Sequence, residues 1–247
     1  MQLLEIVQNV MSSMSLEEVN SMEEVPESIQ IAEIVKETYY EILAHREWEF
    51  LNETFSMQSS GDLSAPTKMV IPSTISDVSF VKYFNEKADK YEDVFYVSPE
   101  EFLELNNNVN LGDNVDQVTG LTKQLNAIFR IYNDRQPEYY TSFDEKNLVF
   151  NAYNKKFDDT LQENKSLCYG TRHSSFVIAD DHEIDMPDEM VWSYLLPEVK
   201  SVASVNLLQI TNVKEEQRSR RGRWRMYHAH PKTTNDYRRE VARFGRK

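Results

Sequence analysis

The hydrophobic period of this chain is helical at both ends and strand-like in the middle. Apolar side chains recur every three or four residues over residues 3–14 and again over residues 31–43, which is typical of amphipathic helices. The same spacing returns over residues 196–210, after a helix start at Pro187. Within this last segment, Pro197 either kinks the helix or marks its effective start. We therefore expect the two ends of the chain to build one helical domain together.

The middle of the chain consists of short aromatic and β-branched runs separated by turns, which indicates strands. Strands are expected near residues 70–71, 78–81, 94–97, 128–132, 139–143, 148–153 and 168–178. A short helix over residues 99–105 should follow a Ser98 cap, and the polar residues 106–120 should form a mobile loop. The order of elements predicts an α+β fold, in which a β-rich, sandwich-like domain is inserted into a helical bundle built from the N- and C-terminal segments.

Charge is divided unevenly along the 247 residues, whose formal net charge is -14. The last 34 residues, 214–247, hold twelve Lys or Arg and four Asp or Glu, while residues 1–213 hold fifteen basic and thirty-seven acidic side chains. The expected parts are residues 1–50 and 185–213 for the helical domain, 51–184 for the insertion, and 214–247 for an extended basic tail. Because the apolar stripe stops after Val213, we expect disorder from about Arg218 until the tail docks on a partner.

Several classes of protein are excluded by what the chain lacks. Its single cysteine, Cys168, rules out a disulfide framework and a zinc site of several thiolates, and we expect it to be a small buried side chain in a strand. The six glycines do not have the spacing of the common nucleotide-binding loops. Apolar runs fall short of the ~20 residues of a membrane span and no secretory signal is recognisable, so the sequence predicts a protein that stays in the cytoplasm where it is made.

One stretch contains the residue types of a metal or hydrolytic site. His173 and residues 180–185, which include His182, supply histidine and carboxylate groups. However, the sequence HEID is not HExxH, and adjacent residues of an extended segment point in different directions. His228 and His230 would face the same way only in an extended segment. The sequence therefore predicts no catalytic residues, no metal site beyond a weakly bound cation, and no cofactor, with a hydrolase acting through this stretch as a minor alternative.

The C-terminal segment mixes arginine with aromatic side chains. The candidate docking residues are Arg218, Arg220, Arg221, Arg223, Trp224, Arg225 and Tyr227. Such a mixture can grip phosphates and stack on bases, dock on an acidic protein groove, or be a solvated helix end. The acidic remainder of the chain argues against a usual nucleic-acid surface, because phosphates need Lys and Arg along the contact face. Docking on a protein is the preferred interpretation, and a nucleic-acid-binding regulator acting through this segment is the alternative.

Three stretches of the sequence, in order, have a recognisable pattern. The first is LLEIVQNVMSSMSLEEVNSMEE, followed by a long helix that runs into REWEF. The second is PEYYTSFDEKNLVFNAY, residues 137–153. The third is MPDEMVWSYLLPEVKSVASVNLLQITNVKEEQRSRR, with Pro187 near its start. The aromatic residues that belong to the first two patterns are Trp48, Phe50, Tyr139, Tyr140 and Phe143.

Together these stretches resemble the tail tubular protein A, or head-to-tail adaptor, family of short-tailed bacteriophages. The match covers about half of the chain, residues 58–126 contribute nothing to it, and Val199 replaces the alanine usual in the third pattern. The resemblance implies a non-enzymatic virion protein made in the host cytoplasm. It further implies a ring of twelve copies that joins the portal to the tail tube or nozzle protein and lines the channel for genomic DNA. The basic tail would then dock on the portal, and the acidic body would repel DNA enough to let it slide.

Overall fold

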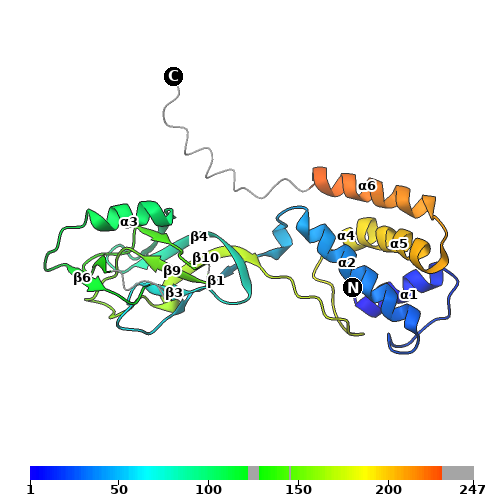
Figure 1. Ribbon diagram of the computed structural model, residues 1–247, viewed down its shortest axis with the longest axis horizontal. Helices are drawn as coiled ribbons and strands as arrows, with labels where there is room; N and C mark the ends of the chain where they lie inside the picture. Colours follow the sequence, from blue (N-terminus) through cyan, green and yellow to red (C-terminus); the bar gives the residue numbers. More distant parts are fainter. Residues whose placement is uncertain (122–127, 145, 230–247) are drawn as a thin grey trace, which may run out of the picture. The chain divides into compact units, whose positions relative to one another are not determined.

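The computed structural model describes residues 1–121, 128–144 and 146–229 (Figure 1). The chain divides into two compact units. The helical unit consists of Met1–Leu51 and the chain from Ser174 onward, and the β unit is Asn52–His173. The expected α+β fold, with helices from both chain ends and a β-rich insertion between them, is therefore confirmed.

The helical unit is held together by apolar stripes at the spacing seen in the sequence. Helix α1 (Leu3–Ser13) and helix α2 (Pro26–Ala44) bury the faces that carry Val7 and Val35, and both helices pack against α5 (Leu196–Leu208). Proline is favourable in the first turn of α2, where the backbone N–H has no partner within the helix. The remaining elements of this unit are the 3-10 turn η1 (Glu49–Leu51), α4 (Asp188–Met190), the π-helical turn η3 (Val191–Leu195) and α6 (Val213–Ala229).

Pro197 marks a change of helix type as well as the start of a helix. It lies in the first turn of α5, directly after the π-helical η3. In a continuous α-helix the N–H of residue 197 would bond to the carbonyl oxygen of Ser193, and proline has no N–H to donate. A π turn is one way in which a helix accommodates such a missing bond. Pro187, the expected helix start, is the N-cap residue of α4.

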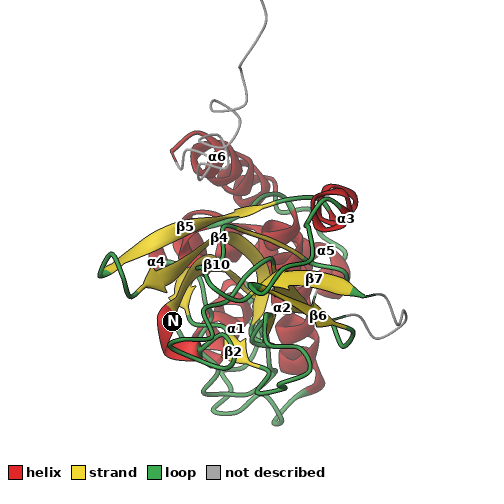
Figure 2. Cartoon of the chain, turned by 90° about the vertical axis from the view of Figure 1, so that its left-hand side faces the viewer, coloured by secondary structure: helices red, strands yellow, loops and turns green. Residues whose placement is uncertain are grey.

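The β unit contains one mixed sheet of eight strands, which curls into a half-barrel, and a separate pair of strands (Figure 2). All neighbours in the large sheet are antiparallel except β5 and β8. The sheet order is β1 (Asn52–Phe55), β10 (Ser166–Arg172), β4 (Ile75–Asn85), β5 (Lys90–Tyr96), β8 (Tyr139–Thr141), β9 (Asn147–Phe150), β3 (Lys68–Val70), β2 (Gln58–Ser59). The pair is β6 (Val115–Val118) with β7 (Phe129–Tyr132), and the unit also contains α3 (Pro99–Asn107) and the 3-10 turn η2 (Glu163–Lys165).

The core of the β unit is formed by side chains of paired strands. All four residues of β9 are buried, and Val81 and Val94 face each other as buried partners on β4 and β5. Helix α3 starts where the sequence indicated, because the Ser98 hydroxyl accepts a hydrogen bond from the backbone N–H of Glu101. Cys168 is fully buried in β10, as expected.

Several expectations about the insertion were wrong in detail. The β-rich part is a single curled sheet with a small separate pair, and not a sandwich. Residues 106–120, which were expected to form a loop, include the end of helix α3 and strand β6. Asn106 is buried, and its side-chain amide both donates to the backbone carbonyl of Arg130 and accepts from the backbone N–H of Arg130. The last expected strand stops at Arg172, because Phe176 belongs to the core of the helical unit. For the same reason the insertion ends at His173 instead of residue 184.

The basic tail was also predicted wrongly where the structure describes it. Residues 213–229 form α6, which packs against α5 and η3, instead of an extended or disordered segment. In Figure 1, α6 (orange) lies alongside α5 (yellow). The rest of the expected tail, residues 230–247, lies outside the described residues. Among the helices of residues 1–121, 128–144 and 146–229, none combines the length and apolar content needed to cross a membrane.

Candidate protein-docking site

Helix α6 starts from a local hydrogen-bonding pattern. Helix α5 ends at Gln209 in the left-handed conformation, and Asn212 then accepts a hydrogen bond through its side-chain oxygen from the N–H of Glu215. The Asn212 carbonyl accepts from the N–H of Glu216. The two glutamates of the first turn lie where negative charge stabilises a helix. The helix direction and start are thus determined by residues 209–216.

The inner face of α6 carries two small residues and one methionine. Ser219 and Met226 are almost fully buried, and Gly222 lies so close to η3 that a Cβ atom there would be 1.9 Å from the carbonyl oxygen of Ser193. The hydroxyl of Ser219 donates to the carboxylate of Glu198 on α5. Residues 219, 222 and 226 are spaced as one helical stripe. Only one of these three residues is a large apolar side chain, so the sequence showed no apolar stripe beyond Val213 and predicted a tail that does not pack.

Arg223 points into the helical unit and is not available for docking. Its Nε donates to the hydroxyl oxygen of Tyr194 at 2.7 Å, and its guanidinium lies 3.7 Å from Glu41 and 4.0 Å from Glu198. Burial raises the pKa of Tyr194 to about 12, so this hydroxyl stays neutral at physiological pH. The contact links α6 to η3, α2 and α5. Arg223 is therefore a residue that holds α6 in place.

Two other predicted docking residues are engaged along α6 itself. Arg218 donates to both carboxylate oxygens of Glu215 at 3.0 and 3.1 Å, and Arg220 pairs with Glu216. Both pairs join helix positions three or four residues apart, and such pairs along a helix contribute only a few tenths of a kcal/mol each. These arginines can exchange partners at little cost. They are, however, largely neutralised in the described molecule.

The outer face of α6 carries unpaired positive charge around an aromatic side chain. We define the α6 outer face as Arg221, Trp224, Arg225 and His228. The indole of Trp224 is 62% exposed and stacks on the His228 ring at 4.3 Å. Arg221 and Arg225 are exposed and form no ion pair with another described residue. Tyr227 lies within α6, but its side chain is outside the described residues.

This face suits contact with carboxylates better than catalysis. Two guanidinium groups one helical turn apart can each bind a carboxylate in bidentate geometry, and an exposed tryptophan supplies apolar contact area between them. The one hydroxyl of α6 that donates to a carboxylate, that of Ser219 to Glu198, is almost fully buried on the opposite side of the helix. Of the seven predicted docking residues, the structure brings Arg221, Trp224 and Arg225 together on the outer face and uses Arg223 internally.

The residues of the family-like pattern lie in or beside the two cores. Trp48 is buried in the helical unit, where its Nε1 donates to the carbonyl of Ile42 at 3.0 Å and its ring stacks on Phe50. Tyr140 is buried against Phe150, with ring centroids 5.7 Å apart. The rings of Tyr139 and Phe143 both contact Phe102 of α3 at 6.1 Å. Packing accounts for all of these side chains.

The side chains of His173 and residues 180–185, which include the residue types of a metal site, do not converge on one point. The Asp180 carboxylate accepts the N–H of Met22 at 2.9 Å, and the His182 ring packs against Phe176 at 4.8 Å. His173 belongs to the β unit, whereas residues 180–185 belong to the helical unit. Within the described residues no three His, Cys, Asp or Glu side chains form a metal-binding group. His230 of the predicted histidine pair lies outside the described residues.

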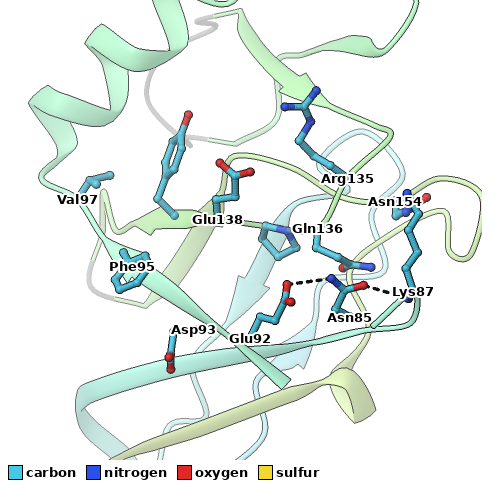
Figure 3. Close-up of a pocket in the computed structure, with 12 residues that line it drawn as sticks. Asn85, Lys87, Glu92, Asp93, Phe95, Val97, Arg135, Gln136, Glu138 and Asn154 are labelled. Atoms are coloured by element: carbon cyan, nitrogen blue, oxygen red, sulfur yellow. Dashed lines mark hydrogen bonds between the residues drawn. The ribbon is translucent and has the colours of Figure 1, made fainter. Parts of the chain in front are cut away.

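A cavity in the β unit was not visible in the sequence. It lies beside the residues that precede the parallel pairing of β5 and β8, which pair only at residues 95–96 with 139–140. Pro137 cannot donate a bond that would extend this ladder towards the start of the strands. The cavity has a volume of about 570 Å³ and is open to solvent. Figure 3 shows acidic, basic and amide side chains on its walls, among them Glu92, which accepts from Asn85 Nδ2 at 2.8 Å. Not all of these polar groups are paired, because the buried Nδ2 of Asn154 has no hydrogen-bond partner among the described residues.

Cys168 is expected to be chemically inert in the folded protein. Its side chain is fully buried in β10, and burial raises the pKa of the thiol to about 12. Because the thiolate is the reactive form, a maleimide should not label native protein at about pH 8 and should label one thiol per chain in denaturant. Mass spectrometry of both samples checks this. Rapid labelling without denaturant would contradict the buried position.

Comparisons with known proteins do not assign this chain to a family. No protein-family model matches the chain, and no curated protein is similar enough to count as a relative. The resemblance to phage head-to-tail adaptors therefore depends on the three sequence stretches described above.

Proposed function

We propose that this protein is a structural virion protein, a head-to-tail adaptor whose copies form a ring between the portal and the tail tube or nozzle of a short-tailed phage. The observation that carries the proposal is the α6 outer face. It presents two unneutralised arginines and an exposed tryptophan on a folded helix of an otherwise acidic protein. Such a surface is ready to dock on carboxylates of another protein molecule. The order of elements, helices from both chain ends with a β insertion, is in line with the resemblance.

Charge supports a structural role beside DNA rather than a role in gripping it. Residues 1–51 contain eleven glutamates and only two basic residues, Lys36 and Arg46. A surface of this sign repels phosphates, which suits a channel that the genome must pass without tight binding. The proposal requires no catalytic group and no cofactor. Its partners are further copies of the chain, expected to number twelve, the portal, and the tail component below the ring.

Electron microscopy of the purified protein, alone and mixed with portal rings of the same phage, tests the proposal. We expect ring-shaped particles in at least one of the two samples, because a ring subunit carries two different faces that close a circle. Native mass spectrometry would give the number of copies. A protein that stays monomeric and does not bind portals would contradict the proposed function.

A nucleic-acid-binding regulator is the second candidate, and the exposed Trp224 between arginines is the observation that favours it. Aromatic stacking on bases together with arginine contacts to phosphates is a known mode of single-strand binding. Because α6 packs on α5, deleting it would damage the helical unit, so Arg221→Gln with Arg225→Gln is the better variant. If the protein is such a regulator, its affinity for DNA should fall steeply as the salt concentration rises, and this variant should not bind DNA.

A further inference from the structure

The helical unit carries a second exposed face that complements the α6 outer face. Opposite the buried stripe of α2 lie Ile29, Glu33, Glu37 and Tyr40, which we define as the α2 outer face. The two glutamates are exposed, and the ion pairs of α2 in the described residues involve Glu41 instead. Ile29 and Tyr40 are 41% and 39% exposed. The only basic residue of α2, Lys36, is half-buried at the edge of this face.

The two faces match in spacing as well as in charge. Glu33 and Glu37 are one helical turn apart, as are Arg221 and Arg225, which places each pair of charges about 6 Å apart along its helix. Both glutamates can therefore meet both arginines at once when the two helices lie along each other. Trp224 then comes beside the apolar side chains of the α2 outer face. Charged pairs around a central aromatic contact are a frequent arrangement in protein interfaces.

Within one chain the two faces cannot satisfy each other. The α6 outer face lies on the side of its helix opposite Ser219 and Gly222, which contact the unit, and the α2 outer face lies opposite the buried Ile31 and Val35. Both faces therefore point away from the core of the helical unit. Two different faces of the same subunit that attract each other produce head-to-tail association, which closes into a ring when the rotation permits.

We propose that the α6 outer face of one copy binds the α2 outer face of the next copy. The inference rests on the proposed ring function and identifies the contact that joins the subunits. It assigns Arg221, Trp224 and Arg225 to a second copy of this chain and not to the portal. The acidity of the partner surface is thus supplied by the protein's own N-terminal helices.

A charge-swap experiment on the full-length protein tests this contact. The variant Arg221→Glu with Arg225→Glu and the variant Glu33→Arg with Glu37→Arg should each remain monomeric, because like charges across the contact weaken association by about a hundred-fold. An equimolar mixture of the two should assemble again, since each reversed face meets a complementary face on the other variant. The fourfold variant should assemble alone. Sedimentation velocity and electron microscopy measure assembly, and circular dichroism checks that each variant is folded.

Matched reversals elsewhere control for the change in net charge. Lys155→Glu with Lys156→Glu repeats the first reversal at exposed positions of the β unit, and Glu100→Arg with Glu104→Arg repeats the second at exposed positions of α3. Both controls should assemble like the unchanged protein. Should a reversed variant fail to fold, Arg221→Gln with Arg225→Gln and a salt titration of the unchanged protein measure the same attraction.

The outcomes separate this contact from the ring function. If the unchanged protein forms rings and both reversed variants form them equally well, the contact is overturned while the ring function stands. Failure of the mixture and of the fourfold variant to assemble, although folded, also overturns the contact. If portal binding alone is lost in Arg221→Glu with Arg225→Glu while rings persist, the α6 outer face belongs to the portal. An unchanged protein that never associates, with or without portals, overturns the ring function itself.

Discussion

Gly222→Ala is expected to release α6 from the helical unit. In an exposed helix this substitution normally stabilises by about 1 kcal/mol. Here the new Cβ would lie 1.9 Å from the carbonyl oxygen of Ser193 and 2.8 Å from its carbonyl carbon, distances that no packed structure allows. Because both obstructing atoms belong to the backbone of η3, they cannot turn aside as a side chain would. We expect a net loss of about 2 kcal/mol in the free energy that holds α6 in place.

Limited trypsin digestion measures this release, because arginines recur along α6. Cleavage of a transiently opened segment follows the population of the open form, so a loss of about 2 kcal/mol should raise the cleavage rate roughly thirty-fold. Gly112→Ala is the control, since no atom lies within 4 Å of a Cβ at that position. Equal cleavage rates for Gly222→Ala and the unchanged protein would show that α6 does not pack as described.

Phe150→Ala is expected to have the largest effect on the β unit. Phe150 is fully buried on β9, its ring lies 5.7 Å from that of Tyr140, and its N–H bonds to the carbonyl of Thr67. Removing a buried phenylalanine ring leaves a cavity and costs about 3–5 kcal/mol of the free energy of unfolding. Phe157→Ala is the matched control at a 46% exposed position, where a change within about 0.5 kcal/mol is expected.

Two spectroscopic signals distinguish the units in this experiment. The three tryptophans, Trp48, Trp192 and Trp224, all belong to the helical unit. Tryptophan fluorescence therefore reports the helical unit, whereas far-ultraviolet circular dichroism reports both units. We expect Phe150→Ala to move the circular dichroism transition in urea to lower concentration by more than it moves the fluorescence transition. A circular dichroism transition at the unchanged urea concentration would contradict the burial of Phe150.

The sequence predicted the parts of the fold that depend on local periodicity. The stripes of α1 and α2 consist of large apolar residues at helical spacing, and the Ser98 cap of α3 is a local hydrogen bond. Features that depend on contacts between distant residues were missed. Strand β6 is a short segment within a polar stretch and is recognisable only through its pairing with β7. The cavity beside Pro137 exists because two strands that are distant in sequence pair only over two residues.

The candidate docking site was predicted by composition but not by geometry. The cluster of arginines with Trp224 singled out this segment, which was predicted to be an extended tail and is a helix. Nothing local distinguishes Arg223, which contacts Tyr194, from Arg221 and Arg225, which face solvent. That distinction follows from the stripe of Ser219, Gly222 and Met226. Two small residues and a methionine at helical spacing opposite a charged face are the signal that would have identified the packed side of α6.

The helical unit is assembled from both ends of the chain, and this has a consequence for its synthesis. A ribosome releases α1 and α2 long before it has made α5 and α6, against which the N-terminal helices and η3 pack. The residues from Asn52 to His173 are complete in the meantime, and a domain that emerges whole can fold as a unit. The parts of the nascent N-terminal helices that α5 will cover therefore stay exposed until the end of synthesis, a state that favours aggregation and chaperone binding.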